Sequence, residues 1–242
     1  MTIGVVVFPG SNADWDALHV VRDVLACDAR YVFHTETQLD AYRALIIPGG
    51  FSYGDYLRCG AIARFSPIGE SIVQAAERGV PILGICNGFQ VLTELHLLPG
   101  ALVRNKQLRF ICRDVHLRVE CEGVFTEGLK DKVLRMPVAH AEGRYHCDEQ
   151  TLAMLRADDR IALRYSDLDG KFGEHSNING SIEGIAGIYN ESRNVLGLMP
   201  HPERAAERVL GSDDGLSLFN AMKRHLDSAP AAPARAREGR GQ

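Results

Sequence analysis

Short runs of aliphatic residues that alternate with helix-like stretches constrain the fold most strongly. The first apolar run, residues 3–8, is followed by Pro9-Gly10. Apolar side chains then recur at helical spacing in residues 13–26. Further apolar runs lie at 31–33, 44–47 and 80–85, and a second helical stretch lies at 67–78. Apolar strands that alternate with helices are typical of a parallel sheet covered on both faces. We therefore predict an α/β fold built on a doubly wound, mostly parallel sheet.

The character of the sequence changes beyond residue 107. Three stretches there alternate between apolar and polar side chains, at 109–119, 160–165 and 181–189, and Asp-Gly and Asn-Gly turn signals stand between them. This pattern predicts an antiparallel β insertion. A buried strand at 195–199 and a closing helix at 216–226 are expected after it.

The length of the chain suits one domain. With 242 residues and 45% hydrophobic residues, the chain can bury a sizeable core. We expect residues 1–226 to form a single domain. The tail at 227–242 has no large apolar side chain and is predicted to be disordered.

The net charge of the chain and the spacing of its cysteines argue against several classes of function. A net charge of -4 argues against a nucleic-acid partner, and no apolar run approaches the roughly 20 residues of a membrane span. The six cysteines are dispersed and none stands in a C-x-x-C pair, which favours a reduced, cytoplasmic setting. No metal site is expected, although His140, His146 and Cys147 lie close together in the sequence. Because the chain has no P-loop and no G-x-G-x-x-G, we expect no nucleotide cofactor on it.

Cys86 is the first candidate for chemistry. It stands between Gly84 and Gly88 after a predicted strand, in the G-x-nucleophile-x-G form of an elbow that exposes a nucleophile above the strand ends. The start of the following helix would favour a thiolate, and the backbone N–H of Asn87 could face an oxyanion. Gln90, four residues after Cys86, would project from the same helix face toward a polar amide substrate. Alternatively, Cys86 is a small buried apolar residue.

A histidine and a glutamate follow the last predicted strand. Pro200 and Pro202 flank His201, so we expect His201 and Glu203 in extended chain, with both side chains on one side. A carboxylate beside an imidazole fixes its tautomer, which would complete a Cys-His-acid arrangement. The alternative is a polar turn without a catalytic role.

A glycine pair ends the strand predicted at 44–47. Gly49 and Gly50, followed by Phe51, could bring a backbone N–H close to a ligand and supply a second oxyanion donor. A tight turn is the other interpretation. The carboxyl ends of parallel strands share one crevice, so this loop, Cys86 and His201 are expected to meet there.

Together these features resemble the class I glutamine amidotransferases. The resemblance rests on PGGFSYGDYLRCGAIA (48–63), GICNGFQVL (84–92), HAEGRY (140–145), NINGS (177–181) and GLMPHPERA (197–205). It implies a flavodoxin-like fold and hydrolysis of glutamine to glutamate and ammonia through a thioester on Cys86. It also implies that Asn105 and Phe110, in the segment after the elbow helix, help to enclose glutamine. His140, Glu142 and Arg144 fall in a family block, where surface or partner contact is as good an interpretation as chemistry.

Within that family, the blocks resemble glutaminase subunits that serve purine biosynthesis. Such subunits pass ammonia to a PurL-type synthetase subunit, assembled with a PurS-type small subunit, and the synthetase uses ATP and magnesium to make an amidine. The resemblance therefore implies partners for this chain and places the ATP site on the partner. Two rivals remain: a cysteine hydrolase of related fold, and a noncatalytic binding subunit.

Overall fold

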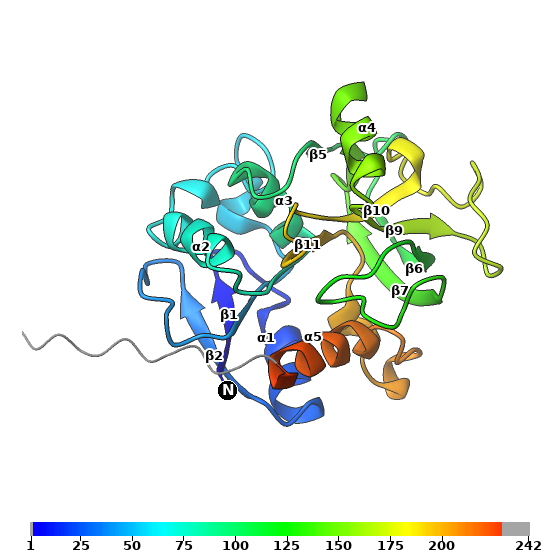
Figure 1. Ribbon diagram of the computed structural model, residues 1–242. Coiled ribbons are helices and arrows are strands. Elements are labelled where there is room, and N and C mark those ends of the chain that lie inside the picture. Colours follow the sequence, from blue (N-terminus) through cyan, green and yellow to red (C-terminus); the bar gives the residue numbers. More distant parts are fainter. Residues whose placement is uncertain (1, 229–242) are drawn as a thin grey trace, which may run out of the picture.

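A nine-stranded sheet lies at the centre of the computed structural model, which describes residues 2–228 (Figure 1). The strand order is β2-β1-β3-β4-β11-β10-β9-β6-β7. The parallel half consists of β1 (Thr2–Val7), β2 (Asp28–Phe33), β3 (Ala44–Ile47), β4 (Ile82–Ile85) and β11 (Val195–Leu198). Every residue of β3, β4 and β11 is buried, as expected where helices cover both faces of a sheet.

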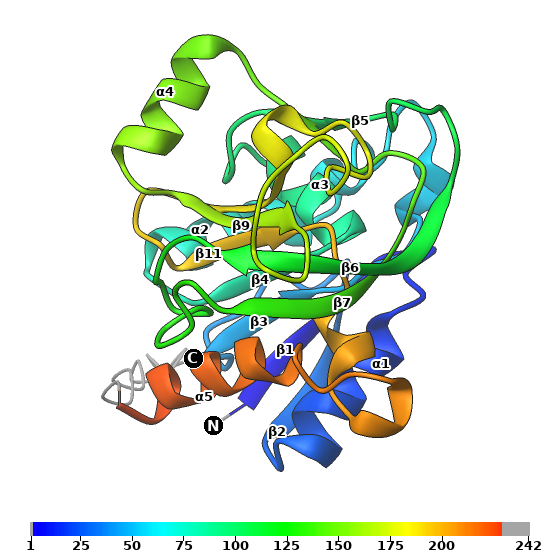
Figure 2. The same ribbon diagram turned by 90° about the vertical axis from the view of Figure 1, so that its right-hand side faces the viewer.

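Helices cover both faces of the parallel half. On one side lie α1 (Asp14–His19) and α5 (Leu216–Ser228), and on the other α2 (Ile68–Glu77) and α3 (Asn87–Glu94) (Figures 1 and 2). All eight residues of α3 are buried. The predicted doubly wound fold is confirmed.

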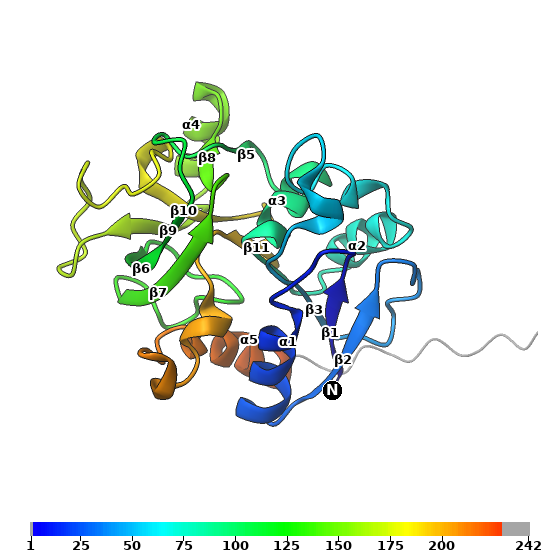
Figure 3. The same cartoon turned by 180° about the vertical axis from the view of Figure 1, so that it is seen from behind.

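The antiparallel strands extend this sheet. They are β10 (Ile185–Tyr189), β9 (Ile161–Ser166), β6 (Ile111–Val119) and β7 (Val133–His140), each antiparallel to its neighbour. A two-stranded ribbon of β5 (Ala101–Val103) and β8 (Arg144–His146) lies with helix α4 (Glu149–Ala157) at the end of the molecule away from α1 and α5 (Figure 3). The predicted β insertion is present, as a continuation of the main sheet.

The sheet curls so that its last strand packs on the loop after β11. The backbone N–H of His201 in that loop donates to the carbonyl of Pro137 in β7 at 2.8 Å, although three strands lie between β11 and β7 in the sheet (Figure 2). The backbone N–H of Arg135 donates to Asp214 at 2.8 Å. Strand β7 therefore supports the carboxyl ends of the parallel strands.

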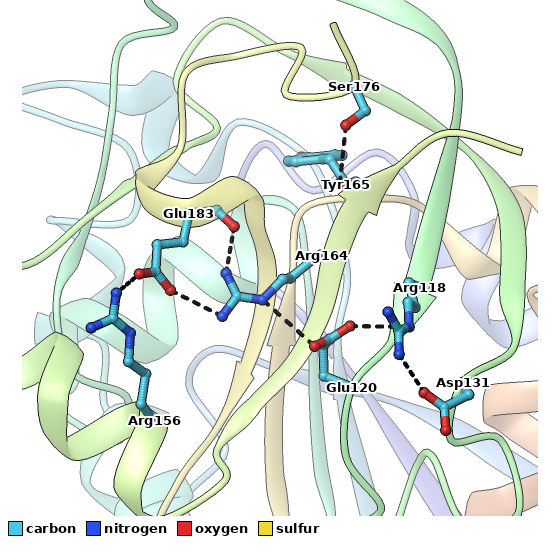
Figure 4. A network of polar contacts seen from close by, with 8 residues as sticks. All are labelled: Arg118, Glu120, Asp131, Arg156, Arg164, Tyr165, Ser176 and Glu183. Carbon is cyan, nitrogen blue, oxygen red and sulfur yellow. Dashed lines mark hydrogen bonds and ion pairs between the residues drawn. The ribbon is translucent and has the colours of Figure 1, made fainter. Parts of the chain in front are cut away.

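Ion pairs tie the antiparallel strands to α4 (Figure 4). Glu120, just after β6, lies 3.6 Å from Arg118 and 3.7 Å from Arg164 of β9. Arg164 also pairs with Glu183 at 3.0 Å, and Glu183 contacts Arg156 of α4. The side chain of Arg164 is only 14% exposed, so its charge is compensated inside this network.

Several element boundaries differ from the sequence prediction. The helix predicted at 13–26 divides into α1 and a π-helical segment, Val20–Val24. Helix α5 reaches Ser228, so the first two residues of the predicted tail are helical, while 229–242 lie outside the described residues. Short 3₁₀-helices occupy Ser52–Asp55, Ala63–Phe65, Ile182–Gly184, Pro202–Ala205 and Arg208–Leu210. Within residues 2–228, no helix has both the length and the apolar character needed to cross a bilayer.

Candidate active site

Cys86 stands at the sharp turn between β4 and α3. Its backbone has φ 53° and ψ −104°, a strained combination for a residue with a side chain. A Cβ on Gly84 would lie 2.8 Å from the carbonyl carbon of Gly88, so glycine allows the strand and the helix to approach this closely. The predicted elbow is present, and it places the thiol at the N-terminus of a fully buried helix.

His201 and Glu203 form a buried pair beside this elbow. Both are 2% exposed, and Nδ1 of His201 lies 2.5 Å from Oε1 of Glu203. Burial alone would lower the pKa of His201, but the negative charges of Glu203 and the Cys86 sulfur raise it to about 10. With Nδ1 bound to Glu203, Nε2 is the nitrogen available to exchange a proton with Cys86.

The extended backbone predicted for both residues is confirmed for His201 and wrong for Glu203. His201 is extended, with φ −105° and ψ 91°, but Glu203 lies in the 3₁₀-helix Pro202–Ala205. Pro202 occupies the first helical position, which its fixed φ favours and where no N–H donor is needed. The short helix turns Glu203 back toward the imidazole, so the expected contact between His201 and Glu203 forms although Glu203 is helical and not extended.

Gly49 and Gly50 form the loop after β3, on the other side of the imidazole. A Cβ on Gly49 would lie 2.7 Å from Cε1 of His201 and 3.5 Å from Cβ of Cys86, so a side chain at this position would collide with the imidazole. Gly50 has φ 151°, and a Cβ there would lie 2.7 Å from the carbonyl oxygen of Gly10. The N–H of Phe51 is already bound to that oxygen at 2.9 Å. This leaves the N–H of Gly50 as the candidate oxyanion donor of the loop.

Asn87 and Gln90 connect the elbow helix to its surroundings. The side chain of Asn87 accepts from the N–H of Ser52 at 3.1 Å and donates to Oε1 of Gln90 at 2.9 Å. Nε2 of Gln90 donates to the carbonyl of Glu142 at 2.6 Å. Both Gln90 amide atoms are therefore engaged within the protein, and any contact with substrate would have to share them.

Asn105 and Phe110 lie on the segment between β5 and β6. Asn105 is fully buried, whereas Phe110 is 53% exposed, as is Phe51 at 48%. The side chain of Asn105 donates to the carbonyls of Arg109 and His140 at 2.9 Å each. Phe110 precedes Ile111, which pairs with His140 at the end of β7. The hydrogen bonds of Asn105 thus hold this segment beside the site.

The two remaining sequence blocks bind one another next to the elbow. Asn179 donates to the carbonyl of Gly143 at 2.8 Å and to the hydroxyl of Tyr165 at 3.4 Å. Tyr165 is buried, and both its burial and the negative charge of Cys86 raise its pKa. Arg144 donates to the carbonyl of Gly180 at 3.0 Å. The HAEGRY and NINGS blocks are therefore joined to one another, and the carbonyl of Glu142 joins the first block to Gln90 of the elbow helix.

Strand β7 is the part of the site that the sequence analysis missed. The carbonyl of Ala139 lies 3.8 Å from the Cys86 sulfur, and His140 is 3% exposed and close enough to His201 for the charge of His201 to lower its pKa. Burial alternates at Leu134, Met136, Val138 and His140. The alternation of these side chains was the available signal, but Pro137 between them argues against a central strand.

Four other cysteines, three of them buried and Cys59 partly exposed, differ from Cys86 in their environment. Burial raises the pKa of Cys27, Cys59 and Cys147, and raises that of Cys121 to about 12. Cys59 in addition donates to Glu142 at 3.2 Å. Across residues 2–228, no three histidine, cysteine or acidic side chains are grouped so as to hold a metal ion. Cys86, beside a positively charged imidazole, is the cysteine placed for nucleophilic chemistry.

Comparisons with known proteins agree with this geometry. Residues 1–216 match the model of the CobB/CobQ-like glutamine amidotransferase domain. The chain is 54% identical over 230 residues to the phosphoribosylformylglycinamidine synthase subunit PurQ of Salinibacter ruber, covering 94% of this chain and 98% of that protein. It is 52% identical over 224 residues to the PurQ subunit of Koribacter versatilis, covering 92% and 97%.

A solved structure gives the same result. A chain in the structure of PurLQS from Thermotoga maritima superposes with a TM-score of 0.82 at 44% identity, covering 93% of this chain and 98% of that one. The strained elbow, the buried His-Glu pair and the glycine loop thus occur in a chain that matches these relatives almost from end to end. The chain belongs to the CobB/CobQ-like glutamine amidotransferase family and, within it, to the PurQ subunits of phosphoribosylformylglycinamidine synthase.

Proposed function

We propose that this chain is the glutaminase subunit of phosphoribosylformylglycinamidine synthase. It hydrolyses glutamine to glutamate and ammonia and supplies the ammonia to a synthetase in purine biosynthesis. The observation that carries the proposal is the meeting of Cys86, on a strained elbow, with the buried His201–Glu203 pair. An acyl-transfer enzyme needs this combination of nucleophile, base and orienting carboxylate.

The reaction begins with attack of the Cys86 sulfur on the side-chain carbonyl carbon of glutamine. The backbone N–H groups of Gly50 and Asn87 stabilise the oxyanion of the tetrahedral intermediate. His201, held by Glu203, donates its proton to the departing nitrogen, and ammonia leaves as the thioester forms. His201 then takes a proton from water, which attacks the thioester, releases glutamate and restores the cysteine.

The remaining predicted substrate residues fall into two groups. Gln90 and Asn105 are buried and make hydrogen bonds within the protein, so they shape the glutamine site by holding the elbow helix and the segment before β6. Phe51 and Phe110 are half exposed and can close over a bound ligand. Gly49 provides the space in which the His201 ring sits.

The partners follow from the family and from the chemistry. Ammonia that escaped into water would be lost, so the chain works in complex with a PurL-type synthetase subunit and a PurS-type small subunit. ATP and magnesium are bound by the synthetase, and the complex is cytoplasmic. Exposed apolar side chains on the segment after the glycine loop offer the synthetase a docking surface next to the site: Tyr56, Leu57 and Phe65.

Glutamate release from glutamine tests the proposal. The purified chain is assayed alone and with both candidate subunits, ATP and the acceptor nucleotide, using Cys86→Ala and, as a matched control, Cys112→Ala, which changes an exposed cysteine. We expect glutamate release that needs Cys86 but not Cys112, increases with the partners and is accompanied by amidine only in the full mixture. Glutamate release without Cys86, or none in the full mixture, would contradict the proposal.

A further inference from the structure

His140 is a second buried histidine next to the reacting groups, and the mechanism above does not use it. It ends β7, the strand whose Pro137 carbonyl accepts from the backbone N–H of His201 at 2.8 Å. The preceding residue, Ala139, places its carbonyl 3.8 Å from the Cys86 sulfur. His140 is thus carried by a strand that contacts both the nucleophile and the residue that donates the proton.

The hydrogen bonds of Asn105 fix the tautomer of His140. The amide nitrogen of Asn105 donates to the carbonyls of Arg109 and His140, which orients its oxygen toward Nδ1 of His140 and the N–H of Gly143, at 3.1 Å each. An amide oxygen can only accept hydrogen bonds, so Nδ1 of His140 carries the proton. Nε2 of a neutral ring is then a lone-pair acceptor.

That acceptor is buried and unused. Within residues 2–228, Nε2 of His140 has no hydrogen-bond partner, and the residue is 3% exposed. A buried acceptor without a partner is unfavourable and is retained where a ligand or water supplies the missing donor. Burial and the positive charge of His201 lower the pKa of His140 to about 4, so the ring stays neutral near pH 7.

We propose that Nε2 of His140 accepts a hydrogen bond from the carboxamide N–H of bound glutamine and keeps this bond while the nitrogen leaves as ammonia. The inference rests on the glutaminase function proposed above. The other N–H donor of glutamine, its α-ammonium group, lies at the far end of a flexible carbon chain from the carbon that Cys86 attacks. The carboxamide is the donor nearest Cys86 and His201, and His140 lies on the strand that contacts both residues, close enough to His201 to feel its charge.

The contact would assist the reaction by orientation. One N–H of the nitrogen points at His140, so the lone pair that develops as the C–N bond breaks can face the proton on His201. His140 itself gains and loses no proton. Gly143 provides the required space, because a side chain there would overlap the His140 ring.

His140→Asn is the variant that isolates the acceptor. The asparagine amide nitrogen can replace Nδ1 as the donor to Asn105, while nothing replaces Nε2. The variant and the wild type are compared, in the assembled complex, on glutamine and on the γ-methyl ester of glutamate. The ester presents the same carbonyl to Cys86, but its leaving oxygen carries no hydrogen before the bond breaks.

We expect kcat/KM for glutamine to fall about 10- to 100-fold and kcat/KM for the ester to change less than about 3-fold. His140→Gln, whose amide oxygen can reach the position of Nε2, should recover part of the loss on glutamine. An equal loss on both substrates would show a structural role and overturn the inference, as would unchanged glutamine hydrolysis. Wild-type complex that hydrolyses the ester but not glutamine would instead contradict the glutaminase function itself.

Discussion

Replacement of Gly49 by alanine tests whether the position of the His201 ring limits the reaction. The new Cβ would lie 2.7 Å from Cε1 of His201, well inside the ordinary carbon–carbon contact distance of about 3.5–4 Å. Gly49 has no positive φ, so alanine introduces no backbone strain and the effect is purely steric. The ring cannot move freely, because its Nδ1, which is bonded to Cε1, is held by Glu203 at 2.5 Å.

The expected loss of activity follows from this overlap between the new Cβ and the His201 ring. Relief requires the ring to move by roughly 1 Å, and a displacement of that size in a catalytic group costs about 10²-fold in rate, or about 2.7 kcal/mol of transition-state stabilisation. Overpacking of a filled core typically lowers the free energy of unfolding by about 1–3 kcal/mol. We therefore expect Gly49→Ala to fold and to lose about 10²-fold in kcat/KM for glutamine.

Gly4→Ala is the matched control, because its Cβ would lie 2.8 Å from a Val32 methyl group inside the sheet and away from the site. Both variants are compared by urea unfolding and by glutamate release per folded protein. Gly4→Ala should lose stability and keep its activity. If Gly49→Ala kept kcat/KM within about 3-fold of the wild type, or if both variants lost activity equally, the argument from ring position would be wrong.

Three further predictions concern charged groups. Glu203→Gln should lower kcat by about 10³- to 10⁴-fold and move the alkaline limb of the pH–rate profile to lower pH, because the charge that raises the pKa of His201 is lost; an unshifted limb would contradict this. Hydrogen bonds to Glu207 and then Asp23 raise the pKa of His19 above its unfolded value, so the stabilisation is full below about pH 6.5 and is lost at higher pH. Urea unfolding should accordingly show a larger loss for His19→Gln at pH 6 than at pH 9, and the reverse order would refute the assignment. Arg164→Ala should lower the free energy of unfolding by about 2 kcal/mol, because the partly buried carboxylates of Glu120 and Glu183 lose their most buried partner and keep only Arg118 and Arg156; a loss below about 1 kcal/mol would show that the network contributes no more than surface ion pairs do.

The parallel half of the fold was predictable because each strand there carries its own signal. The run at 44–47 is β3 without any change of boundary, and the elbow around Cys86 follows β4 as expected. Continuous apolar runs mark strands buried on both faces, and the glycines mark the turns that such strands need. The meeting of Cys86 with His201 could be predicted because parallel strands end at one edge of the sheet.

The contacts that the antiparallel strands make with the site could not be predicted from local sequence patterns. The approach of Ala139 to Cys86 depends on how the sheet curls, and no local pattern encodes this. Pro137 also concealed β7, since proline argues against a central strand but is tolerated in the strand at the sheet edge. The buried contacts of Gln90 and Asn105 likewise depend on chain segments far away in sequence, which a helical-face argument cannot foresee.

The thioester on Cys86 is the intermediate on which the mechanism depends, and it can be detected directly. The assembled complex is mixed with glutamine, quenched in acid within a turnover, digested and analysed by mass spectrometry, with Cys86→Ala as control. The mechanism predicts a glutamyl adduct on the peptide that contains Cys86, formed before glutamate accumulates and absent from the variant. Steady release of glutamate with no such adduct, or with the adduct on another cysteine, would contradict the assignment of Cys86 as the nucleophile.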